Sequence, residues 1–176
     1  GNDVFDTLTV TNPPPPPPPP PPPDGDGDVT DHRLKITVYT DLGIDRYNMV
    51  AMLAVPSEDF VLPCDEDVTV TAWAQDPDDP SQEIELFSDT IPKGTASTCG
   101  GKYRATQPGP HLKEVIFQEN SPSWVYVYVY AVKGTYFQDQ RAAMSDQAFL
   151  EWAGTIEKAK ISIMIGDRVW SGWSDG

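Results

Sequence analysis

Residues 123–132 read Ser-Trp-Val-Tyr-Val-Tyr-Val-Tyr-Ala-Val and carry the plainest structural signal of the chain. Valine and tyrosine alternate with period two, which is the period of a β-strand. The valines are expected to face a core. The opposite face, with Tyr126, Tyr128 and Tyr130, is expected to pack within the fold, and the alternatives are a protein interface or a carbohydrate platform. This stretch therefore predicts a strand with one buried face.

Further strand signals lie on both sides of this stretch, as short runs of β-branched and aromatic residues bounded by turn-forming residues. The longest apolar run predicts a central strand, and the last two strands are expected to form a hairpin. Such a series predicts an antiparallel β-sandwich, immunoglobulin-like or jelly-roll, in an all-β protein. The nine predicted strands are residues 34–39, 48–55, 67–74, 83–87, 101–105, 112–117, 123–132, 158–167 and 168–173.

One helix interrupts the strands. Ser145 has the character of an N-cap, and Gly154 is suited to end a helix over residues 146–153. Residues 136–144 and 95–101 are expected to be irregular, and residues 76–80 (Asp-Pro-Asp-Asp-Pro) predict a turn. The sandwich is thus expected to carry one short helix in an insertion.

The two cysteines, Cys64 and Cys99, lie far apart and lack Cys-x-x-Cys spacing. In an acidic chain with few lysines we expect one disulfide and a location outside the cell or at its surface. The alternative is two buried thiols. The sequence contains no Asn-x-Ser/Thr sequon, so any glycan would be O-linked.

The charge is strongly negative, with 12 Lys and Arg against 27 Asp and Glu and a net charge of −15. Such a chain repels nucleic acid, and it has no basic cluster. No stretch approaches the ~20 apolar residues of a membrane span. The only histidines, His32 and His111, are expected to be solvated loop residues, and no nucleophile elbow, zinc-protease motif or phosphate loop occurs. We therefore expect neither an enzyme nor a required cofactor.

Eleven consecutive prolines occupy residues 13–23. Proline lacks an N–H and has a fixed φ, so this run predicts a polyproline II rod of about 34 Å. The rod divides the chain into an N-terminal segment (residues 1–12), the rod with an acidic hinge (13–31) and the β-sandwich domain (32–176). Asp24, Asp26 and Asp28 alternate with glycine in the hinge and are candidate Ca²⁺ ligands, although a solvated hinge is the simpler interpretation.

The N-terminal segment contains one strand-like stretch, residues 4–11, with no partner strand beside it in sequence. An isolated strand is unstable in water, so we expect it to add to the sheet of a neighbouring molecule. The alternatives are a linker to an upstream domain and a disordered tail. The side chains expected to fill pockets are either Val4, Leu8 and Val10 or Phe5, Thr7 and Thr9.

Four stretches resemble a domain type of secreted bacterial multidomain proteins, namely Gly101-Lys102-Tyr103, Leu112-Lys113-Glu114-Val115, residues 124–132 and residues 161–167. The resemblance implies a sandwich without enzymatic activity. Residues 137–155, which carry the predicted helix, depart from the pattern of that domain type. The proline run is similar to the hydroxyproline-rich rods of algal wall and mastigoneme proteins and of extracellular filaments. It implies that these prolines are hydroxylated and carry O-glycans: Pro13, Pro14, Pro15, Pro16, Pro17, Pro18, Pro19, Pro20, Pro21, Pro22 and Pro23.

Together these features predict a structural subunit of an extracellular filament. Each subunit would donate its N-terminal strand to the next copy of the same chain, head to tail, because such an interface does not close on itself. The alternative is a carbohydrate-binding or adhesion module tethered by the proline run to an upstream domain. Its polysaccharide platform would be Trp170 with Trp173, or the row of Tyr126, Tyr128 and Tyr130.

Overall fold

The computed structural model describes residues 27–39, 44–53, 61–121, 124–132 and 136–173. The predicted donor strand, the prolines 13–23 and the candidate Ca²⁺ ligands Asp24 and Asp26 lie outside these residues. Asp28 lies in the first strand, where the structure describes the backbone alone.

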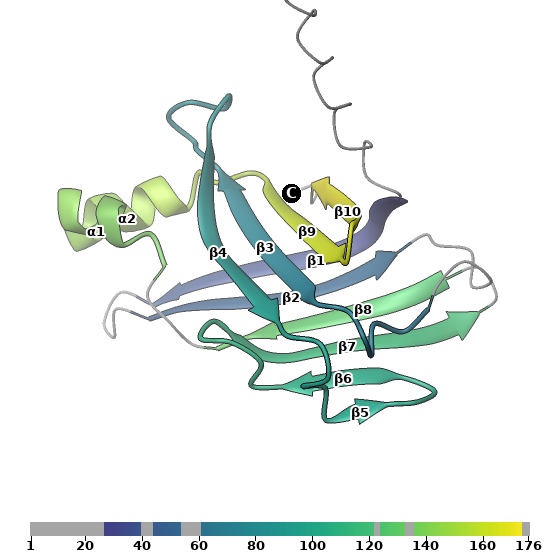
Figure 1. The fold of residues 1–176 in the computed structure, drawn as a ribbon. Coiled ribbons are helices and arrows are strands. Elements are labelled where there is room, and N and C mark those ends of the chain that lie inside the picture. Colours follow the sequence, from purple (N-terminus) through teal and green to yellow (C-terminus); the bar gives the residue numbers. More distant parts are fainter. Residues whose placement is uncertain (1–26, 40–43, 54–60, 122–123, 133–135, 174–176) are drawn as a thin grey trace, which may run out of the picture.

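The chain forms two antiparallel sheets that share one strand, as expected for an all-β sandwich (Figure 1). In the β3 sheet the order is β4-β3-β9-β10, and in the β8 sheet it is β2-β8-β7-β6-β5. β1 joins them, because Gly27 and Asp28 pair in parallel with β10 and the strand pairs with β2 from Val29 onward. The strands are β1 (Gly27–Tyr39), β2 (Ile44–Leu53), β3 (Val68–Gln75), β4 (Glu83–Ile91), β5 (Thr98–Cys99), β6 (Tyr103–Thr106), β7 (Leu112–Ser121), β8 (Trp124–Ala131), β9 (Ala159–Ile165) and β10 (Arg168–Trp173).

The inward faces of the two sheets form one hydrophobic core. The valines of β8 are fully buried, as the alternating pattern of residues 123–132 predicts. Facing strands contribute alternate residues in the same way, so each sheet presents one apolar face. Burial of each valine or isoleucine side chain contributes about 1.5–3 kcal/mol, and burial of an alanine methyl contributes less. The core strands β3, β8 and β9 supply Val68, Val70, Ala72, Ala74, Val125, Val127, Val129, Ile161, Ile163 and Ile165.

Most predicted strands are confirmed, including the central position of β2 between β1 and β8 and the hairpin of β9 and β10. Four strands, β1, β2, β4 and β7, extend four or more residues beyond their predicted bounds, and one strand was not predicted. β1 begins at Gly27, inside the predicted hinge, since backbone pairing to β10 outweighs the low strand preference of Asp and Gly. β4 extends to Ile91 along β3. The predicted loop 95–101 contains the two-residue strand β5, which pairs with β6.

The insertion holds two short helices rather than one, α1 (Gln138–Ala143) and α2 (Asp146–Ala153). Ser145 caps α2 as predicted, and its hydroxyl accepts a hydrogen bond from the Ala148 amide at 3.3 Å. The sequence gives α1 no amphipathic pattern, because none of its own residues is buried. It begins after Phe137, whose φ is 57° and whose ring is buried. Tertiary packing of that ring, rather than helix propensity, therefore starts α1.

Aromatic side chains attach the two helices to the sandwich. Phe137 packs edge-on against Trp152, with ring centroids 5.5 Å apart, and Phe149 lies 5.9 Å from Trp152. The Arg141 guanidinium lies 4.4 Å from the Phe149 ring centroid. Trp152 Nε1 donates to Asp78 Oδ2 at 3.0 Å, in the loop between β3 and β4. The helices are thus tied to the end of the β3 sheet.

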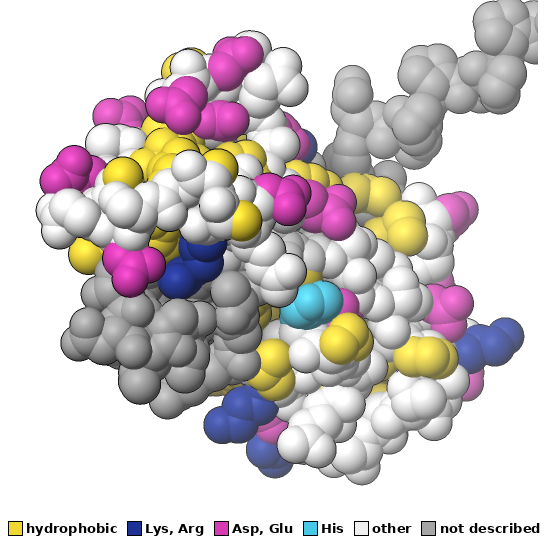
Figure 2. Space-filling view, turned by 90° about the vertical axis from the view of Figure 1, so that its left-hand side faces the viewer, with side chains coloured by type: hydrophobic (Ala, Val, Ile, Leu, Met, Phe, Trp, Pro, Cys, Tyr) yellow, Lys and Arg dark blue, Asp and Glu magenta, His cyan; other side chains and the backbone are white. Residues whose placement is uncertain are grey.

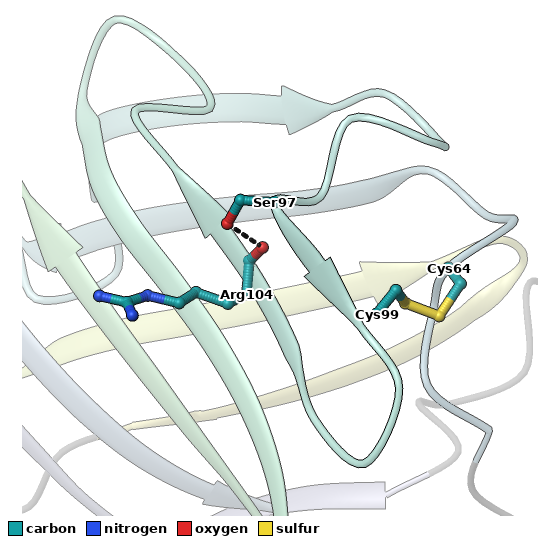
Figure 3. The surroundings of a disulfide bond; sticks show 4 residues. All are labelled: Cys64, Ser97, Cys99 and Arg104. Atoms are coloured by element: carbon teal, nitrogen blue, oxygen red, sulfur yellow. Dashed lines mark hydrogen bonds between the residues drawn. A yellow bond between two sulfur atoms is a disulfide. The ribbon is translucent and has the colours of Figure 1, made fainter.

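The predicted disulfide is confirmed between Cys64 and Cys99, whose Cα atoms are 5.8 Å apart (Figure 3). It ties the segment before β3 to β5, the edge strand of the β8 sheet. Beside it the Ser97 hydroxyl donates to the Arg104 carbonyl oxygen at 3.0 Å, as Figure 3 shows. The disulfide therefore connects the two sheets covalently.

Tyr103 should make the fold sensitive to alkali. Its side chain is buried against Phe117, with ring centroids 5.4 Å apart, and burial raises its pKa from 10.0 to about 12. The folded state holds this proton more tightly than the unfolded state, so the contribution is complete below pH 10 and is lost as the pH rises toward 12. We expect a loss of about 2 kcal/mol at pH 12.

Urea unfolding of the wild type and of Tyr103→Phe at pH 9 and pH 12 measures this contribution. Phenylalanine has no ionisable group, so the variant should keep about 2 kcal/mol more of its pH 9 stability. Equal losses in both proteins would show that Tyr103 does not carry the effect.

Candidate functional site

The outer face of the β3 sheet carries two ordered rows of side chains that cross its four strands. Alternation along each strand puts every second residue on this face. The pairing register then determines which residues of adjacent strands lie side by side. We call the first the hydroxyl row, made of Ser88, Thr71, Ser162 and Ser171. The second is the aromatic–lysine row, made of Glu85, Trp73, Lys160 and Trp173.

Lys160 lies between the two tryptophans of the aromatic–lysine row. Its Nζ is 5.0 Å from the ring centroid of Trp73 and 5.6 Å from that of Trp173. Such cation–π contacts at an exposed site contribute about 0.5–1 kcal/mol each. Nζ also lies 3.4 Å from Glu83 Oε1, a partly exposed ion pair that adds little stability. Lys160 therefore contacts both tryptophan rings of the row.

Trp173 remains accessible despite these contacts. Its side chain is 36% exposed and it stands at the end of the row on β10. Met164, on the same face of β9, is 39% exposed. Aromatic and aliphatic surface therefore stays open to solvent on this face.

The hydroxyl row is internally hydrogen-bonded in part. Thr71 Oγ1 and Ser88 Oγ are 2.8 Å apart, and Thr69 Oγ1 and Thr90 Oγ1, on the same face, are also 2.8 Å apart. A hydroxyl has one donor and two acceptor sites, so Ser88, Thr69 and Thr90 keep further hydrogen-bonding capacity, whereas Thr71 is buried. The face thus combines aromatic rings with donors and acceptors.

The prediction that Trp170 and Trp173 form one platform is wrong. Trp170 is buried, only 1% exposed, whereas Trp173 faces outward. Residues three positions apart in a strand lie on opposite faces, which period-two reasoning alone could have shown. On the outward face, Trp173 shares its row with Trp73, one hundred residues earlier in the chain, and the strand register places Lys160 between them.

The tyrosine row of β8 lies on the outer face of the other sheet. Tyr126, Tyr128 and Tyr130 are each partly buried, and the rings of Tyr126 and Tyr128 stack with centroids 6.3 Å apart. Close by, Arg104 of β6 and Glu114 of β7 form an ion pair. The three tyrosine side chains are therefore partly covered, and they lie beside an ion pair on the same sheet.

A buried carboxylate bridges the two sheets near the turn before β7. Asp89, on β4, is buried and accepts two hydrogen bonds of 2.8 Å from His111, one from its backbone amide and one at ring Nδ1. The His111 ring stacks on Phe87, with centroids 5.7 Å apart. Figure 2 shows a histidine side chain at the surface on this side, with an acidic side chain beside it.

This bridge corrects the expectation that His111 is merely a solvated loop residue. Its ring is 43% exposed, yet it is held by both an ion-pair geometry and a stacking contact. Gly109 is required beside it, because an added Cβ would lie 2.6 Å from Asp89 Oδ2. The pairing joins residues 22 positions apart, so no local motif predicts it.

The acidic groups of the turn at residues 76–80 accept hydrogen bonds from within the turn, from Ser81 and from Trp152. Asp76 Oδ1 accepts from the Asp78 amide at 2.9 Å, and Asp78 Oδ2 accepts from Trp152. The pKa of Asp79 is lowered, first by the Ser81 hydroxyl and then by the Ser81 amide. Among the described residues no group of three His, Cys, Asp or Glu side chains could hold a metal ion.

None of the described helices is long and apolar enough to cross a membrane. Comparison of the chain with protein-family models, with curated proteins and with solved structures finds no match.

Proposed function

We propose that the chain is a structural subunit of an extracellular filament that assembles head to tail by strand addition. The observation that carries this proposal is the edge of β1. From Val29 to Tyr39 its pairing with other described strands is on the β2 side alone. A β-strand edge of that length is a template for a further strand from another chain.

The proposed occupant is the N-terminal segment of a second copy. The donated segment would be residues 3–11, which include the strand-like stretch 4–11; these nine residues are fewer than the eleven residues of the β1 edge. Backbone hydrogen bonds would supply affinity, and alternate side chains would supply specificity.

The proline run explains why the occupant would come from a neighbour. In a polyproline II conformation, residues 13–23 would place the segment about 34 Å from the start of β1. Only residues 24–26 separate the run from β1, so a rigid rod leaves little chain for the segment to return to its own β1 edge. The rod would set the spacing of subunits, and hydroxylation with O-glycans would stiffen it.

The disulfide supports an extracellular location, because such bonds persist in oxidising compartments. The net charge of −15 also opposes non-specific self-association. A specific backbone-mediated contact would therefore be needed to hold the subunits together.

Light scattering and negative-stain microscopy test this proposal on the intact chain and on a chain starting at Asp24. We expect fibres from the intact chain and monomers from the shortened one. A peptide of residues 1–12 should bind the shortened chain with one-to-one stoichiometry in fluorescence anisotropy, and a scrambled peptide should not. Monomers of equal stability in both cases would refute the proposal.

Two full-length variants identify the face of the donated strand. Leu8→Asp places a charge on the face shared with Val4 and Val10, and Thr7→Asp places it on the face shared with Phe5 and Thr9. A charge in a buried pocket costs far more than one at the surface, so only one variant should abolish fibres. Fibres from both variants would contradict pocket filling by this segment.

A further inference from the structure

We propose that the outer face of the β3 sheet binds a neutral polysaccharide, with Trp173 and Trp73 as stacking surfaces. This inference concerns described residues of the domain and does not depend on strand addition. It assigns a ligand class to the aromatic–lysine row and to the hydroxyl row beside it.

The chemistry of the face matches that of a sugar chain. A pyranose ring has a face of C–H groups and a rim of hydroxyls, so it needs an aromatic surface together with hydrogen-bond donors and acceptors. The tryptophans supply the surface, and Lys160 holds their rings by its contacts of 5.0 and 5.6 Å. The hydroxyl row runs parallel to them across the same strands, with partly exposed Ser162 and Ser171 nearest to Lys160 and Trp173.

The spacing of the row favours a chain over a single sugar. Trp73 and Trp173 pair with Lys160 from opposite sides, so they stand two strand spacings apart, about 10 Å. Two rings at that distance would contact different units of an extended oligosaccharide. The ligand would therefore lie across the strands, along the row.

The charges of the face favour a neutral chain. Lys160 is its central cation and is already paired with Glu83 at 3.4 Å, and Glu85 is exposed at the end of the row. The whole chain carries a net charge of −15. Anionic polysaccharides would be repelled, whereas uncharged hydroxyls can use the carboxylates of Glu83 and Glu85 as acceptors.

Calorimetry and tryptophan fluorescence with defined hexasaccharides test this inference on the intact chain. The probes are cellohexaose, xylohexaose, mannohexaose and maltohexaose, with a galacturonic acid hexamer as the anionic counterpart. We expect saturable binding of at least one neutral hexasaccharide and none of the anionic one. Trp173→Ala should weaken binding by about tenfold, the effect of losing one aromatic stacking surface.

Met164→Ala is the matched control, because Met164 is equally exposed on the same face but stands outside both rows. It should bind like the wild type. Binding of none of the four neutral hexasaccharides, or unchanged binding by Trp173→Ala with the fold intact by circular dichroism, would overturn the inference. A Trp173→Ala variant that changes only the oligomeric state would overturn it as well, by making the face a subunit interface.

The two proposals fail separately. Leu8→Asp or Thr7→Asp should leave hexasaccharide binding unchanged, since residues 7 and 8 lie outside the β3 sheet. Trp173→Ala should likewise leave fibre formation unchanged. Loss of binding in a donor-strand variant would contradict a site confined to this face.

Discussion

Replacing Cys64 and Cys99 together by serine should lower the free energy of unfolding by about 4 kcal/mol. The disulfide closes a loop with a sequence separation of 35, and the unfolded chain gains the corresponding conformational entropy when the bond is absent. The melting temperature should fall by about 10 °C. Urea and thermal unfolding of the double variant, and of the wild type under reducing conditions, measure the effect.

The loss should also have a local component. β5 has two exposed residues and, among the described strands, pairs only with β6, so the disulfide is its main attachment to the β3 sheet. Hydrogen exchange should accelerate in β5 and β6 of the double variant before it does in β8. Ser97→Ala is the matched control in the same segment, because it removes one exposed hydrogen bond to the Arg104 carbonyl. A double variant as stable as Ser97→Ala would rule out a stabilising role for the bond.

Asp89→Ala should lower the free energy of unfolding by about 3 kcal/mol. The carboxylate accepts two 2.8 Å hydrogen bonds from His111, and the change leaves the His111 amide without this acceptor. Of the contacts between β4 and the turn before β7, the stacking of Phe87 on the His111 ring would remain. Chemical denaturation at neutral pH measures the loss.

His111→Phe separates the two hydrogen bonds of this bridge. It preserves an aromatic ring to stack on Phe87 and the backbone amide that donates to Asp89, and it removes the Nδ1 contact alone. Because the His111 ring is 43% exposed, this variant should lose only about 1 kcal/mol. If Asp89→Ala were no less stable than His111→Phe, the buried carboxylate would not be the main stabilising group.

Local pattern predicted the strands well where burial is one-sided. The valines of residues 125, 127 and 129 face the core because period-two alternation leaves a strand no other way to bury them. α1 was missed for the opposite reason. Its own residues contribute nothing to the core, and the neighbouring ring of Phe137 anchors it instead.

Of the aromatic–lysine row, the sequence indicated only Trp173 as a candidate residue. Trp173 stands out near the C-terminal end, but alternation puts its neighbour Trp170 on the buried face. Trp73 and Lys160 become its companions through the pairing of β3, β9 and β10. Strand order in a sheet is a long-range property, so spacing along the chain does not reveal such a row.

The sequence by itself predicted a β-sandwich and allowed at most one intramolecular disulfide, which the structure confirms. Its alternating patterns can bury apolar side chains only between two sheets, and its two cysteines allow only one intramolecular disulfide. Tertiary structure alone decided that β1 joins both sheets, that Asp89 meets His111, and that two tryptophans flank Lys160. These contacts depend on strand order, strand register and sheet packing. Each of these brings together residues that are distant along the chain, so local sequence patterns do not specify them.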